Sequence, residues 1–295
     1  MNLKVMSVLP GFRYSLVAAA GLTRHETGER LTVDPSPQIP RRQASVALRR
    51  GLAYSGKLRL DLHVPVAEGR YPLVVYLPGG GFVRAPRAMG RRERAFIAAA
   101  GYAVASVEYR TTRQRATYAD GLADIHAAVG HLTDRADEYR IDPRRIGIWG
   151  ESAGGYLASL AGLTDARIRA VVDLFGASDL TRVADGFDPP MQAAAADPRH
   201  PIHRYRAATA NPIELVRPDA PAFLLLHGDD DRIIPPAQTL LLHQALLDAG
   251  AESTHYLLAG AGHGRLALNR HQAQQWTTIQ VMTIIKEFLD RHLRS

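Results

Sequence analysis

Cysteine is absent from the 295-residue sequence. Its absence excludes a disulfide scaffold, a thiolate metal site and a thiol nucleophile. No run of 18 or more apolar residues occurs either, so we expect no transmembrane helix. Lysine is scarce: Lys4, Lys57 and Lys286 are the only three, and arginine supplies the other 33 of the 36 basic residues (36 − 3).

The 36 basic and 29 acidic residues give a net charge of +7. A basic balance can indicate binding to nucleic acid or to an anionic membrane. The arginines are spread along the chain, however, so we expect neither a nucleic-acid partner nor stable membrane insertion. One local cluster, Arg110, Arg113 and Arg115, is considered separately below.

The first 45 residues differ from the rest of the chain. The stretch from Asp34 to Pro40 is rich in proline and is typical of an extended linker. We therefore expect residues 1–45 to form an N-terminal extension and a candidate lid. The apolar start, residues 5–22, faintly resembles a signal peptide, but Pro10, Gly11 and Arg13 interrupt it. The predicted location is cytoplasmic, with secretion as the alternative.

From residue 46 to 295, signals for strands and helices alternate. Apolar or alternating runs predict strands at residues 58–64, 73–77, 103–105, 146–149, 170–175, 223–226 and 254–258. Helical stretches lie between them, at residues 91–100, 120–136, 153–163, 237–249 and 272–292. This order predicts one α/β domain with a mostly parallel central sheet and helices on both faces. A proline-rich break predicts an insertion near residues 178–221.

The sharpest motif is GESAGG at residues 150–155. It is a G-x-S-x-G pattern that follows a predicted strand and opens a predicted helix, as a nucleophile elbow requires. Its glycines permit a tight turn in which Ser152 takes a strained backbone conformation. We therefore predict that Ser152 is a nucleophile at the carboxyl end of a strand.

A serine nucleophile needs a base, and the base needs an orienting carboxylate. Among the 12 histidines, His263 lies in a glycine-rich loop after the last predicted strand and is the candidate base. His227, which ends the preceding strand, is expected to be structural. Three consecutive aspartates at positions 229–231 follow His227, and spacing alone does not choose between them. The order serine, aspartate, histidine is that of α/β-hydrolases.

The final requirement is a set of N–H groups that bind the oxyanion. Three consecutive glycines at positions 79–81 follow an early buried strand, and glycines let the backbone approach a tetrahedral intermediate closely. The residue after the nucleophile, Ala153, would supply a second donor. The phosphate-binding pattern G-x-x-x-x-G-K-[ST] and metal-ligand spacings are absent. We therefore expect no cofactor and no metal.

These motifs together resemble the α/β-hydrolase carboxylesterases related to hormone-sensitive lipase and to bacterial feruloyl-esterase-like enzymes. The resemblance rests on residues 78–82, 150–155, 227–235 and 260–263 and extends over residues 58–292. It implies an α/β-hydrolase fold with a small lid. It also implies a triad of Ser152, Asp231 and His263, in which Asp231 stands at the family's aspartate position. The implied oxyanion donors are Gly80, Gly81 and Ala153.

The chain departs from that family at two places. Pro78 replaces the usual histidine before the glycines, and because proline lacks an N–H, this loop must be held differently. After Tyr109 the usual segment is replaced by one that carries Arg113 and Arg115. Phe82 and these two arginines are our candidate substrate-binding residues, and the arginines would attract carboxylate-bearing esters if they face the cleft. The alternative is a solvated loop that faces away.

The predicted function is that of a serine carboxylesterase that hydrolyses small to medium carboxylic esters through an acyl-enzyme intermediate. Its partner would be a small-molecule ester. An arylformamidase or another amidase with the same triad is the alternative. A non-catalytic, hydrolase-like binding protein is a further alternative, but such proteins lose a member of the triad, and all three are present here.

Overall fold

The computed structural model describes residues 28–182 and 211–294, together with five positions between those ranges, Ala193, Ala196, Asp197, Arg199 and His203. Residues 1–27 of the predicted N-terminal extension and most of the predicted insertion near residues 178–221 therefore lie outside the described residues. No helix in the described ranges is long and apolar enough to cross a bilayer.

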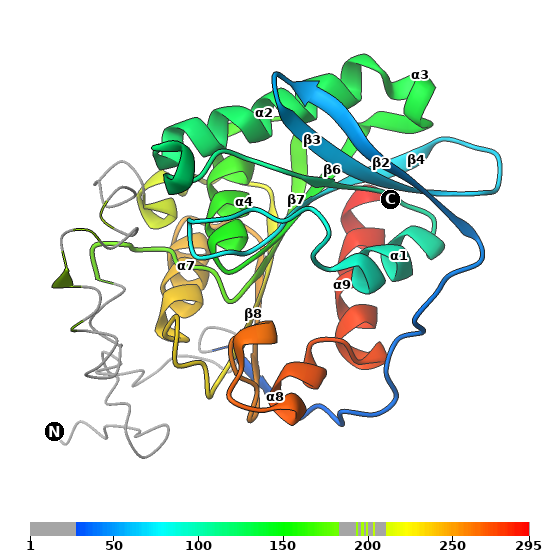
Figure 1. Cartoon of the computed structure of the whole chain (residues 1–295). Coiled ribbons are helices and arrows are strands. Elements are labelled where there is room, and N and C mark those ends of the chain that lie inside the picture. The colour runs from blue at the N-terminus through cyan, green and yellow to red at the C-terminus, as the bar shows by residue number, and fades with distance from the viewer. Residues whose placement is uncertain are drawn as a thin grey trace, which may run out of the picture.

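A nine-stranded sheet forms the centre of the structure (Figure 1). Its strands are β1 (Glu29–Leu31), β2 (Val46–Ser55), β3 (Leu58–Pro65), β4 (Tyr71–Leu77), β5 (Ala103–Val107), β6 (Ile141–Glu151), β7 (Ile168–Leu174), β8 (Ala222–Gly228) and β9 (Ser253–Leu258). They lie in the order β1-β9-β8-β7-β6-β4-β5-β3-β2. Only the pairs β2–β3 and β3–β5 are antiparallel. The sheet is thus mostly parallel, as predicted.

Helices cover both faces of the sheet (Figure 1). Residues from α2 (Tyr118–Asp134), α4 (Ala153–Thr164) and α7 (Ala237–Asp248) belong to one hydrophobic core. Residues from α1 (Arg91–Ala99) and α9 (Ile279–Leu293) belong to a second core. Two short helices, α3 (Ala136–Tyr139) and α8 (Arg270–Gln275), also lie within residues 28–182 and 211–294.

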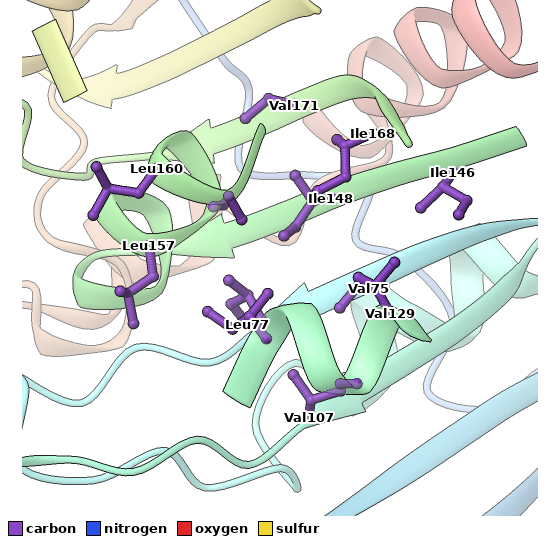
Figure 2. Close-up of a cluster of buried hydrophobic side chains, with 14 of the residues drawn as sticks. Val75, Leu77, Val107, Val129, Ile146, Ile148, Leu157, Leu160, Ile168 and Val171 are labelled. Atoms are coloured by element: carbon purple, nitrogen blue, oxygen red, sulfur yellow. The ribbon is translucent and has the colours of Figure 1, made fainter. Parts of the chain in front are cut away.

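The apolar run of β4 shows why the fold needs both layers of helices. Leu73, Val75 and Leu77 enter the core under α2 and α4, whereas Val74 and Tyr76 enter the core under α1 and α9. Successive side chains of a strand point to opposite faces, so a continuous apolar run requires cover on both sides. Figure 2 shows the first of these cores, where Val75 and Leu77 lie with side chains of the neighbouring strands and helices.

Three features of the sheet and helices were not anticipated. β1 pairs with β9, so the sheet begins inside the segment predicted to be an extension. β2 forms an antiparallel edge that no strand signal had indicated. The helix predicted over residues 272–292 is interrupted: α8 ends at Gln275, and the side chain of Thr278 then accepts a hydrogen bond from the N–H of Val281 and caps the start of α9.

The parallel strands place their carboxyl ends at one edge of the sheet. β4, β6, β8 and β9 all run in the same direction. The glycine loop, Ser152, the three aspartates and His263 follow these strands in turn. Open α/β sheets bind ligands at this edge, and the fold therefore gathers there the residues that the sequence singled out.

Candidate active site

Ser152 sits on a strained turn between β6 and α4. Its backbone angles are φ 56° and ψ −121°, a left-handed conformation that side chains rarely adopt. The turn is too tight for side chains at two flanking positions: a Cβ on Gly150 would lie 2.0 Å from the Gly154 oxygen, and one on Gly154 would lie 2.1 Å from the Leu77 oxygen. The N–H of Ser152 donates to the carbonyl of Leu174, at 2.9 Å. Close packing and this bond hold the strained turn in place.

His263 bridges Ser152 and Asp231. Its Nε2 lies 2.8 Å from Ser152 Oγ, and its Nδ1 lies 2.7 Å from Asp231 Oδ2. Because an ionised carboxylate only accepts, the proton of the neutral ring belongs on Nδ1, and Nε2 is left to accept from the serine hydroxyl. Both His263 and Asp231 are buried, whereas Ser152 is partly exposed. His263 can therefore accept the proton of the Ser152 hydroxyl, and an incoming molecule can reach that hydroxyl.

The three consecutive aspartates have different partners. Asp229 accepts from the N–H of Gly260, at 2.6 Å, and pairs with Arg30 of β1, at 2.7 Å. Asp230 contacts Gln272 and lies 3.3 Å from the guanidinium of Arg232. Asp231 is therefore the member of the run that contacts His263, while the first two fasten neighbouring loops.

Asp231 is held as an anion by its surroundings. Its Oδ1 accepts from the N–H groups of Ile233 and Ile234, at 2.8 and 3.0 Å. Burial alone would raise the pKa of its carboxyl, but the charge of His263 and the interactions with His227 and His263 outweigh burial and hold that pKa well below its ordinary value. Asp231 therefore stays ionised while it orients the imidazole.

Phe175 and Trp276, which we call the aromatic wall, pack beside the His263 imidazole. The sequence did not predict a role for either residue. The ring of Phe175 lies 4.8 Å from that of His263 and 4.7 Å from that of Trp276, between ring centroids. Phe175 itself has a φ of 46°. The indole N–H of Trp276 donates to the carbonyl of Gly262, at 2.9 Å. The wall thus fixes both the His263 ring and the loop that carries it.

The glycine loop packs directly on the nucleophile turn. A Cβ on Gly79 would lie 2.9 Å from the Glu151 oxygen, and one on Gly80 would lie 2.0 Å from the Arg84 oxygen. Gly81 has a φ of 60°. Within the described residues, no acceptor engages the N–H groups of the three predicted oxyanion donors, Gly80, Gly81 and Ala153. The packing of Gly79 places the loop beside Ser152.

The structure also shows how the loop is held without the family's histidine. The buried hydroxyl of Tyr109 donates to the carbonyl of Pro78, at 2.6 Å. The N–H and the hydroxyl of Thr112 both donate to the carbonyl of Phe82, each at 2.9 Å. The segment after β5 therefore fastens both ends of the glycine loop.

The candidate substrate-binding residues divide into one buried and two exposed side chains. Phe82 is only 7% exposed and packs edge-on against Tyr156, with 5.7 Å between ring centroids. Arg113 and Arg115 are exposed, in the segment that is bonded to the glycine loop. The neighbouring Arg110 pairs with Asp124, at 2.9 Å, and serves the fold.

Two other carboxyl groups near the site are perturbed. Asp173 is fully buried, and burial raises the pKa of its carboxyl to about 7. It accepts from the hydroxyl of Ser159 and the N–H of Gly176, each at 2.9 Å. Burial, and then the charge of Glu93, raise the pKa of Glu151 to about 7. Neither carboxyl contacts His263, and no group of three metal-ligating side chains is found in the described parts of the chain.

The chain is similar in sequence to one protein family and to several known proteins. Residues 60–246, more than half of the chain, match the model of the BD-FAE family. Two relatives in Mycobacterium tuberculosis are 30% identical: a probable carboxylic ester hydrolase, LipM, over 58% of this chain and 43% of its own length, and the esterase LipC, over 65% and 53%. The chain thus spans about half the length of these relatives.

Solved structures agree on the fold. A truncated carbohydrate esterase from gut microbiota superimposes with a TM-score of 0.72 at 24% identity, over 84% of this chain and 97% of that one. A thermophilic esterase from Thermogutta terrifontis gives a TM-score of 0.66 at 21% identity, over 84% of this chain and 92% of that one. The chain therefore has the α/β-hydrolase fold that was predicted.

Proposed function

Since the chain belongs to the BD-FAE family, we propose that it is a serine carboxylesterase that hydrolyses small to medium carboxylic esters. The observation that carries the proposal is the continuous hydrogen-bonded series from Ser152 through His263 to Asp231, with steps of 2.8 and 2.7 Å. Such distances are those of a nucleophile and base within reach of each other. The names of the mycobacterial relatives support the same reaction class.

In the proposed reaction, Ser152 Oγ attacks the ester carbonyl carbon while its proton passes to His263 Nε2. The tetrahedral intermediate collapses, the bond to the alcohol oxygen breaks, and His263 returns the proton to the leaving alcohol. Water then attacks the acyl-enzyme, giving one proton to His263, and the acid leaves as Ser152 recovers its proton. Asp231 stays ionised throughout and stabilises the transient imidazolium.

The oxyanion of both tetrahedral intermediates would be bound by backbone N–H groups. Gly80 and Gly81 supply them from the loop after β4, and Ala153 supplies one from the first turn of α4, where the helix dipole also favours negative charge. This assignment rests on the packing of the glycine loop against the nucleophile turn.

The substrate side of the proposal involves the segment after β5. Arg113 and Arg115 are exposed there, and the same segment is bonded to the glycine loop through Thr112. Two arginines at the rim of a cleft raise the local concentration of anionic esters. The ring of Phe82 is mostly enclosed, so we assign its substrate contact to the small part that remains exposed.

The test is hydrolysis of p-nitrophenyl acetate by the wild type and by Ser152→Ala. Loss of the nucleophile should lower kcat on the order of 10⁶-fold, as in a serine protease whose nucleophile is removed, while circular dichroism shows an unchanged fold. A folded variant that keeps a tenth of the activity would disprove the assignment.

A panel that includes N-formylkynurenine separates esterase from formamidase, the alternative that the names of the relatives do not favour. We expect kcat/KM to be higher for the esters. A preference for the formamide would move the function to that alternative.

A further inference from the structure

Asp231 has a second histidine beside it, in addition to His263. His227, the penultimate residue of β8, is fully buried. Its Nε2 lies 2.9 Å from the carbonyl oxygen of Ile234 and 3.3 Å from Asp231 Oδ2. Both neighbours only accept hydrogen bonds, so Nε2 must carry a proton. The N–H of His227 therefore faces both ends of the turn from Asp231 to Ile234.

The other ring nitrogen of His227 is fixed by a buried hydroxyl. Because a neutral imidazole has one proton, Nδ1 must accept, and Thr239 Oγ1 lies 2.9 Å away as its donor. Thr239 Oγ1 in turn lies 3.0 Å from His255 Nε2, which must then donate to it. The single proton of the Thr239 hydroxyl is assigned to His227 Nδ1, because the carbonyl oxygen of Pro236 is more distant, at 3.3 Å. The series then runs from His255 through Thr239 to His227 and the Asp231 turn.

The surroundings of His255, at the far end of the series, are consistent with this direction of the hydrogen bonds. His255 carries its proton on Nε2, so its Nδ1 is an acceptor, and that atom is buried without a partner in the described part of the chain. Burial holds the pKa of His255 well below its ordinary value, so the ring is neutral. Bonds aligned in one direction polarise and strengthen each other.

We propose that His227 is a positioning residue for the reaction, which fixes the carboxylate of Asp231 through the Asp231–Ile234 turn. The inference rests on the proposed function and extends it, because the sequence alone favoured a purely structural role for this histidine. A misplaced Asp231 misorients His263, and errors of about 1 Å remote from the chemistry can cost about 10²-fold in rate.

The test compares His227→Gln with His227→Asn. Both side chains are neutral amides, but the longer glutamine can place its N–H where His227 Nε2 lies, and the shorter asparagine cannot reach the Asp231 turn. We expect the asparagine variant to lose about 10- to 100-fold in kcat with little change in KM, and the glutamine variant to recover much of that loss. The acid limb of kcat/KM should shift in the asparagine variant only.

A second pair keeps the inference testable if His227→Asn does not fold. Thr239→Val removes the hydroxyl that fixes His227, while Thr239→Ser retains it, so kcat should fall in the first variant and not in the second. Ser253→Ala is the matched control: it removes a buried hydroxyl 2.8 Å from His243 Nδ1, outside the series that reaches Asp231, and should leave kcat unchanged.

Two outcomes would overturn the inference. Equal kcat in the two His227 variants, with rates expressed per active site, would show that the N–H facing the Asp231 turn has no part in positioning. Lower thermal stability with unchanged kcat and pH profile in Thr239→Val would show a structural role only. An inactive wild type would instead refute the proposed esterase itself, so the two failures are distinguishable.

Discussion

Replacing Asp231 by asparagine should disable the site although the side chain keeps its size. In the wild type, Oδ1 accepts from two backbone N–H groups at 2.8 and 3.0 Å, and Oδ2 accepts from His263 Nδ1 at 2.7 Å. An amide has one oxygen for these three donors. Turning its NH₂ toward the backbone would leave both N–H groups unsatisfied, at about 1–3 kcal/mol for the buried one at Ile234. The oxygen should therefore stay with the backbone.

The NH₂ group of the new asparagine then faces His263 Nδ1. The imidazole must move its proton to Nε2, where it meets Ser152 Oγ as a donor and can no longer accept the serine proton. This wrong tautomer costs about 10⁴ in kcat in a serine protease with the same arrangement, which corresponds to about 5 kcal/mol in the activation free energy. We expect a loss of that order here, with KM nearly unchanged.

The assay is the steady-state kcat for p-nitrophenyl acetate, with Asp229→Asn and Asp230→Asn as matched controls. Asp229 can still accept from Gly260 through its amide oxygen, and Asp230 contacts Gln272 and the exposed Arg232. Both controls should stay within about tenfold of the wild type. If Asp229→Asn were the crippled variant, or if folded Asp231→Asn kept a tenth of the activity, the assigned role of Asp231 would be wrong.

Three further predictions concern the loop, the core and the rim. Tyr109→Phe removes the bond to the Pro78 carbonyl and should lower kcat about tenfold while the protein stays folded; an unchanged kcat would show that the glycine loop needs no such anchor. Burial raises the pKa of Asp173 to about 7 in the folded state, so its contribution to stability is complete below the unfolded pKa near 4 and is lost as pH rises through about 7. Asp173→Asn should therefore make urea unfolding less dependent on pH between about 4 and 7, and an undiminished slope would contradict the burial argument. Arg113→Ala/Arg115→Ala should reduce the kcat/KM ratio of a carboxylate-bearing ester to its neutral analogue, most strongly at low ionic strength, and an unchanged ratio would exclude these arginines from selection.

The parts of the fold that the sequence predicts are those with strong local signals. The continuous apolar run of β4 and the G-x-S-x-G pattern around Ser152 depend on neighbouring residues only. β1 and β2 gave no such signal: β1 has three residues, and β2 alternates mostly partly exposed and exposed positions. They are ordered by pairing with strands already in the sheet, which is a long-range effect.

The candidate site, too, was predictable only where a local sequence pattern marks its residues. The order of serine, aspartate and histidine was readable, but the distinct roles of the three aspartates depend on contacts with Arg30, Gln272 and His263 far along the chain. The wall of Phe175 and Trp276 joins the end of β7 to the end of α8, and no local pattern marks either residue. His227 appeared structural because its partners, Thr239 and Ile234, become visible only when β8 and α7 pack together.

Phe82, Ser152 and Phe175, at the carboxyl edge of the sheet, have a left-handed backbone, with φ of 61°, 56° and 46°. Each such conformation costs about 1–3 kcal/mol, and the surrounding structure must sustain it. Glycine at Phe82 or Phe175 would relieve the backbone, but it would also remove a buried ring from the core. Truncating a buried phenylalanine costs about 3–5 kcal/mol, which exceeds the strain that is relieved. The rings that pack on Tyr156 and behind His263 therefore keep their strained backbone in place, and a heat-resistant form of this protein is better sought at the amino-terminal edge of the sheet.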